Sequence, residues 1–183
     1  MTKEIEDMKL ITYPRSGQNL FRMLLRQQGY SVLASHEITH FLDKKQTITI
    51  IRNPVESVAS AMAMVDFYKK ENGYGIIPRM LKKYEETYTW LLENATYVIS
   101  YEDLTNDPKN TIEKFLDHFS LKRSSVEYQF NLSKDDAKEG YLVSSKNVSS
   151  YPEALDYTKT APFIEDAKEI YQKLVFSKWV GGN

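Results

Sequence analysis

The stretch that decides the fold is LITYPRSGQNLF, residues 10–21. Its apolar beginning predicts a buried strand, and a helix-like pattern starts at residue 18. A compact Pro-Arg-Ser-Gly turn, residues 14–17, joins the two. This order leaves the first backbone N–H groups of the helix at the turn, where they and the helix dipole attract anions. Arg15 adds a positive charge there. The turn is therefore either a phosphate-binding loop or a plain structural turn with a surface arginine.

Length and composition fit one ordinary globular domain. The 183 residues are 42% hydrophobic and 27% charged, so residues 1–183 are expected to form a single domain. The net charge of −1 gives no broad positive surface that would favour nucleic acid as a partner. No apolar run approaches the ~18 residues of a membrane span. Cysteine is absent and four of the first seven residues are charged, so a cytoplasmic location is expected.

Alternating strand and helix patterns predict an α/β fold with a central parallel β-sheet flanked by helices. Strands are predicted at residues 8–13, 30–34, 47–51 and 97–100. Helices are predicted at residues 18–28, 54–70, 77–93, 107–118 and 162–179. Residues 133–161 show no periodicity and are expected to form long loops. Ligands of such sheets bind beyond the carboxyl ends of the strands, which is where the 14–17 turn is expected.

Two more segments follow predicted strand ends. Residues 52–60, RNPVESVAS, place Arg52 directly after a strand and Ser60 about two helical turns along, near the same helix face. An arginine and a hydroxyl that converge from one side suit a second phosphate, although Arg52 could equally form an ion pair at the helix start. Tyr101 begins the segment YEDL, residues 101–104, and could contact a base or cover the edge of the core.

Together these segments resemble the family of PAPS-dependent sulfotransferases, whose donor is 3′-phosphoadenosine 5′-phosphosulfate (PAPS). The family's 5′-phosphosulfate loop, Tyr-Pro-Lys/Arg-Ser-Gly-Thr-Thr/Asn-Trp/Leu, is similar to residues 13–20. Its 3′-phosphate motif, Arg-Asn-Pro-x-Asp/Glu-x-x-x-Ser, is similar to residues 52–60, and its Tyr-Glu-Asp-Leu segment to residues 101–104. The resemblance implies a P-loop-like three-layer fold. The nucleotide-binding core would span about residues 8–120, followed by a C-terminal loop and helix in residues 121–183.

The resemblance also implies which residues bind PAPS and its product, adenosine 3′,5′-bisphosphate (PAP). They are Arg15, Ser16, Gly17, Gln18 and Asn19 for the 5′-phosphosulfate, Arg52 and Ser60 for the 3′-phosphate, and Tyr101 for the adenine. The C-terminal segment that completes the family's 3′-phosphate site is not recognisable here. Lys146 is the candidate substitute, and a solvated loop lysine is the competing interpretation.

Many family members carry a histidine between the first two motifs that acts as a general base. The segment 35–37, Ser-His-Glu, occupies that place, so His36 is the expected base and His40 the second candidate. His118 is expected on the core side of its helix, in a structural role. A histidine that titrates near neutral pH suits removal of the acceptor's proton. Arg15 and the helix-start amides suit the charge that grows on the departing phosphate oxygen.

The acceptor and two alternative functions stay open at this point. The acceptor is expected to be a small molecule or glycan that offers a hydroxyl or an amine, and its pocket to be lined from residues 62–74 and 141–157. No metal is expected, because sulfuryl transfer needs none and the sequence shows no ligand cluster. One alternative is a nucleotide-binding module without transfer activity, since the chain is shorter than typical family members. The other is a small nucleotide-dependent kinase, which the missing Walker A lysine disfavours.

Overall fold

The computed structural model describes residues 2–38, 46–64, 73–125, 128 and 151–180. In this part of the chain, four strands form one sheet in the order β2-β1-β3-β4, and each neighbouring pair is parallel. The strands are β1 (Lys3–Ile11), β2 (Tyr30–Ser35), β3 (Gln46–Ile51) and β4 (Tyr97–Ser100). The predicted parallel sheet is confirmed.

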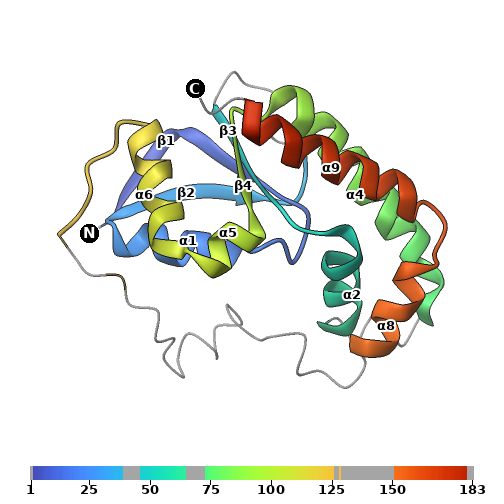
Figure 1. Ribbon diagram of the computed structural model, residues 1–183. Helices are drawn as coiled ribbons and strands as arrows, with labels where there is room; N and C mark the ends of the chain where they lie inside the picture. Colours follow the sequence, from blue (N-terminus) through green and yellow to red (C-terminus); the bar gives the residue numbers. More distant parts are fainter. Residues whose placement is uncertain (1, 39–45, 65–72, 126–127, 129–150, 181–183) are drawn as a thin grey trace.

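Helices cover both faces of the sheet, as Figure 1 shows. One layer consists of α1 (Gln18–Gln27), α5 (Tyr101–Asn106) and α6 (Pro108–His118). The other consists of α2 (Pro54–Met64), η1 (Gly73–Ile76), α4 (Ile77–Asn94), α8 (Tyr151–Lys159) and α9 (Ile164–Val180). Because side chains alternate along a strand, Leu10 and Ile50 pack on the first layer while Ile11 and Ile51 pack on the second. The fold is a three-layer α/β sandwich.

The first strand is longer than its predicted range, residues 8–13. Its first part, residues 3–7, is charged and mostly solvent-exposed, while its last four residues are buried. Lys3 and Glu4 nevertheless pair with β2, and the register shifts before Lys9. An apolar pattern can reveal only the buried half of such a strand, which explains the difference.

The expectation of long loops over residues 133–161 is wrong in its last part, where α8 lies. The residues of α8 that are buried are Tyr151, Ala154 and Thr158, a narrow stripe of one large and two small side chains. Such a stripe produces little periodicity in hydropathy. The C-terminal part therefore has two described helices where one was expected, while residues 133–150 lie outside the described residues. The predicted helix over residues 54–70 is confirmed as far as Met64, and residues 65–72 lie outside the description.

The expected core position of His118 is also wrong. His118 is exposed at the end of α6, whose buried residues are Ile112, Phe115 and Leu116. Its ring lies against the rings of Tyr97 and Phe119, with centroid separations of 4.7 Å in both cases. None of the helices in the described ranges combines the length and apolar character that crossing a membrane requires.

The strand order sets where a ligand can bind. The chain leaves β1 through α1 to reach β2 on one side, whereas β3 lies on the other side of β1. Leu10 pairs with Ile48, so β1 and β3 run side by side and end at the same edge of the sheet. Parallel α/β sheets bind ligands at such a reversal of strand order, so we expect the ligand-binding crevice of this fold between the segments that follow Ile11 and Ile51.

Candidate functional site

The loop after β1 brings the N-terminus of α1 to this crevice. Arg15 and Gly17 both have left-handed backbone, with φ of 65° and 95°. Gly17 is the N-cap of α1, no side chain caps the helix, and its first turn holds no acidic residue. The first amide groups of α1 are therefore not engaged by a capping side chain, and they suit an anion.

The other two helices that start at this edge in the described residues differ from α1. At α2, the Oδ1 of Asn53 accepts a hydrogen bond from the backbone N–H of Val55 at 3.0 Å, and Glu56 lies in the first turn. At α5, the Oγ of Ser100 accepts from the N–H of Asp103 at 3.1 Å, and the first turn holds two acidic residues. Of these three helix starts, α1 is the one prepared for an external anion.

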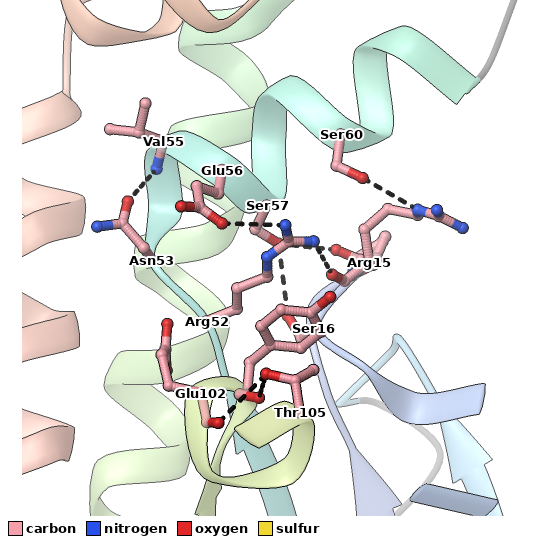
Figure 2. Close-up of polar contacts among 12 residues, drawn as sticks. Arg15, Ser16, Arg52, Asn53, Val55, Glu56, Ser57, Ser60, Glu102 and Thr105 are labelled. Carbon is pink, nitrogen blue, oxygen red and sulfur yellow. Dashed lines mark hydrogen bonds and ion pairs between the residues drawn. The ribbon is translucent and has the colours of Figure 1, made fainter. Parts of the chain in front are cut away.

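Arg52 is buried at the end of β3 and joins the motifs together, as Figure 2 shows. Its Nη1 donates to the carbonyl of Arg15 at 2.9 Å, and its Nη2 pairs with the carboxylate of Glu56 at 3.1 Å. Its guanidinium carbon lies 4.2 Å from the centroid of the Tyr101 ring. Its Nε is buried and has no hydrogen-bond partner among the described residues. One donor of this guanidinium is thus buried and unused within the described part of the site.

Arg15 turns back toward α2 from the same loop. Its Nε donates to the Oγ of the fully buried Ser60 at 3.2 Å. Burial lowers the pKa of Arg15, and the positive charge of Arg52 lowers it further. Two guanidinium groups that lie close together are favourable neighbours when a negative charge lies with them.

The other residues of the predicted anion loop point in different directions. The hydroxyl of Ser16 is buried, 3.1 Å from the hydroxyl of Tyr88 and 3.4 Å from that of Ser57. Ser16 can therefore offer a ligand its backbone N–H but not its side chain. The Oε1 of Gln18 accepts from the hydroxyl of Thr12 at 3.2 Å. Asn19 is half-buried in the first turn of α1.

Tyr101 closes the loop from the side of β4. It is the first residue of α5, and its half-buried ring lies against both Arg52 and Gly17. A Cβ added at Gly17 would lie 2.9 Å from Cδ2 of this ring, so the close approach requires glycine. The helix α5 was not predicted, although Ser100 followed by Asp103 has the spacing of a helix N-cap signal.

His36 directly follows β2 and is exposed. Its Nδ1 lies 2.8 Å from the carbonyl oxygen of Thr12, the first residue after β1. A carbonyl can only accept, so Nδ1 carries the hydrogen and Nε2 is the proton acceptor of the neutral ring. The second candidate for the base, His40, lies outside the described residues, as does Lys146, the candidate for the 3′-phosphate site.

Sequence reasoning missed two buried tyrosines of α4 that reach the site from behind. Tyr88 donates to the carbonyl of Ile50 at 2.7 Å, and Tyr84 donates to the carbonyl of Arg52 at 2.6 Å. The spacing of four residues on a helix places both hydroxyls on one face. A buried tyrosine hydroxyl requires a hydrogen-bond partner. Two tyrosines four residues apart in a predicted helix were therefore the available signal that this helix face contacts polar backbone groups.

The two segments expected to line the acceptor pocket meet at their described ends. The rings of Tyr74 and Tyr157 are stacked, with centroids 4.4 Å apart and an interplanar angle of 19°. The hydroxyl of Tyr74 donates to Glu153 at 2.7 Å. Residues 65–72 and 141–150 of these segments lie outside the described residues. The described ranges contain no group of three or more acidic, histidine or cysteine residues that could hold a metal ion.

The sheet, its helix layers and the loop after β1 define the class: a P-loop-like, three-layer α/β protein with the fold of sulfotransferases. Among solved structures, the chain is similar to mouse sulfotransferase SULT7A1 complexed with PAP, with a TM-score of 0.55 and 14% sequence identity. The similarity covers 96% of this chain and 85% of that one. No protein-family model matches the chain, and no curated protein matches it in sequence.

Proposed function

We propose that the protein is a sulfotransferase that transfers the sulfuryl group of PAPS to a hydroxyl, or to an amine, of a small-molecule or glycan acceptor. The observation that carries the proposal is the meeting of Arg15 and Arg52 at the uncapped start of α1. This arrangement concentrates positive charge and N–H donors at one point of the crevice. The similarity of the fold to a sulfotransferase that was solved with PAP supports it.

The residues at the crevice fit a nucleotide that carries two phosphate ends. Arg15 and the backbone amides of residues 16–19 would hold the 5′-phosphosulfate, since they offer donors at a helix start. Arg52, with its unused buried Nε, and Ser60 would hold the 3′-phosphate, with Lys146 as a further candidate. Tyr101 would lie on the adenine side.

When bound, PAPS supplies an activated sulfuryl group. His36 would remove the acceptor's proton at Nε2 while the acceptor oxygen forms its bond to sulfur. Arg15 would stabilise the negative charge that the phosphate oxygen gains as its bond to sulfur breaks. PAP and the sulfated acceptor would leave with that charge on PAP. The chemistry of these side chains requires no metal.

Calorimetry with PAP tests the binding step. We expect metal-independent binding, with Arg15→Ala and Arg52→Ala each raising the Kd at least ~10-fold, because each removes a charge-assisted hydrogen bond. Arg26→Ala, at the exposed end of α1, is the matched control and should leave the Kd unchanged. An absence of PAP binding would overturn the proposal, and a preference for ATP with Mg²⁺ would favour a kinase.

A second assay separates the enzyme from a binding module. The protein is incubated with PAPS and, in turn, a phenol, an alkyl alcohol, a sugar and an amine, and the release of PAP is measured. Acceptor-dependent release is the expected result, and the acceptor class that gives it identifies the substrate chemistry. PAP binding without acceptor-dependent release from any class would favour a nucleotide-binding module instead.

A further inference from the structure

We propose that Tyr84 and Tyr88 are positioning residues for the two ends of the nucleotide, Tyr88 for the 5′-end through the loop 13–17 and Tyr84 for the 3′-end through Arg52. This inference rests on the proposed function. Both side chains are fully buried in α4, behind the sheet edge that carries the loops. Neither can touch a ligand, so each acts through the backbone that it holds.

Tyr88 connects the loop after β1 to β3. Its hydroxyl donates to the carbonyl of Ile50 at 2.7 Å and lies 3.1 Å from the hydroxyl of Ser16. It also accepts from the backbone N–H of Tyr13 at 3.4 Å. One phenol oxygen thereby connects the end of β3 to both ends of the turn formed by residues 13–16.

Tyr84 performs the corresponding task at the end of β3. Its hydroxyl donates to the carbonyl of Arg52 at 2.6 Å. The guanidinium of Arg52 in turn donates to the carbonyl of Arg15. The rings of Tyr84 and Tyr88 contact each other with centroids 4.5 Å apart, so the two hydroxyls are held in fixed relation to one another.

The loop needs such external support because its own conformation is unfavourable. Arg15 adopts a left-handed backbone that a residue with a side chain rarely adopts. Ser57 supplies a third hydroxyl, which donates to the carbonyl of Pro14 at 2.9 Å. The hydrogen bonds of Tyr88 and Ser57 therefore hold the donors of residues 15–17 in place before any ligand arrives.

Two half-ligands, nucleotides that each carry only one of the two phosphates, test whether Tyr88 supports the 5′-end and Tyr84 the 3′-end. We expect Tyr88→Phe to raise the Kd of adenosine 5′-monophosphate about 5–10-fold and to change that of adenosine 3′-monophosphate less than about 2-fold. Tyr84→Phe should give the opposite selectivity. Both variants keep the ring, so only the hydroxyl is removed. Transfer assays should show Tyr88→Phe lowering kcat, since it loosens Arg15, and Tyr84→Phe raising mainly KM for PAPS.

Tyr30→Phe is the matched control, because its hydroxyl also donates to a backbone carbonyl, that of Lys122 at 3.1 Å, far from the crevice. It should move neither Kd. If Tyr88→Phe fails to fold, Ser57→Ala replaces it and should show the same selective loss for the 5′-monophosphate.

The outcomes are distinguishable. If the unaltered protein binds neither PAP nor the monophosphates, the proposed function fails. If it binds PAP and both tyrosine variants change the two half-ligands equally, or change neither, the tyrosines are ordinary core residues and the inference is overturned. Selective and opposite losses establish it.

Discussion

The Nε of Arg15 donates a hydrogen bond to the Oγ of Ser60 at 3.2 Å, although the two residues are 45 positions apart. The two segments that the sequence separates into a 5′ loop and a 3′ motif therefore share a hydrogen-bond network. A substitution of Arg15, Arg52 or Ser60 itself is therefore expected to affect both ends of the ligand, and variants of these three residues should be interpreted together.

Arg15→Gly should leave the fold intact while it removes the binding function. Glycine accepts the left-handed backbone at this position, and the substitution also removes one of two neighbouring positive charges. We expect the free energy of unfolding to stay within ~1 kcal/mol of the original value. The Kd of PAP should rise at least ~10-fold and the transfer rate should fall roughly 10²-fold. A loss of more than ~2 kcal/mol in urea unfolding would show that Arg15 is a structural residue instead.

His36→Ala should separate catalysis from binding. The imidazole is exposed and bonds to the backbone of Thr12, so its removal leaves the anion loop in place. We expect kcat to fall about 10²–10⁴-fold, with the Kd of PAP unchanged within about 2-fold. His118→Ala, which alters another exposed histidine, should change neither quantity. Full activity of His36→Ala together with loss of activity in His40→Ala would make His40 the base.

Gly17→Ala should damage the site more than an equivalent change elsewhere. The new Cβ would lie 2.9 Å from the ring of Tyr101, in a residue whose φ is +95°. We expect a loss of about 1–3 kcal/mol in the free energy of unfolding and at least ~10-fold weaker PAP binding. Gly29→Ala is the control, since Gly29 also has positive φ but has open space around it. If both variants bind PAP equally well, contact with Tyr101 does not matter for the site.

Alkaline pH should unfold the protein through its buried tyrosines. Burial raises the pKa of Tyr84 and Tyr88, so the folded state keeps these phenols neutral above the ordinary value of about 10. Their contribution to stability is complete below pH ~10 and is lost as the pH rises toward the folded-state values, by about 1.4 kcal/mol per pH unit for each tyrosine. Urea unfolding at pH 8, 10 and 11 measures this decline. Tyr84→Phe should make the decline of the free energy of unfolding with pH shallower by the contribution of one tyrosine. An unchanged slope would contradict the role given to Tyr84 in this decline.

Much of the sheet could be predicted because most of its strands are apolar or β-branched runs that are visible within a single segment of sequence. The β-branched run at residues 47–51 became β3, and the loops at Arg15 and Arg52 were expected at strand ends, where they are. The hydropathy of single segments does not say which strands are neighbours. The adjacency of β1 and β3, which creates the crevice, is a property of the whole chain and could not be derived in this way.

The candidate site was predicted as separate pieces, and its interior was missed. The sequence indicated Ser16 as a residue that binds the 5′-phosphosulfate, but its hydroxyl is turned inward to Tyr88. The contact between Tyr101 and Gly17 depends on α5, a helix of six residues that is stabilised by its cap at Ser100. Side-chain direction and the contacts of α4 arise from tertiary packing, which a local pattern does not contain.

The ion pair between Arg52 and Glu56 has a consequence for how salt acts on the protein. Arg52 already has an anionic partner within the chain, so an arriving phosphate would meet a guanidinium whose charge is partly neutralised and not a bare cationic site. Fewer small ions would then be released than the number of arginines implies. Nucleotide affinity should therefore decline gently with ionic strength, and Glu56→Gln should make that decline steeper.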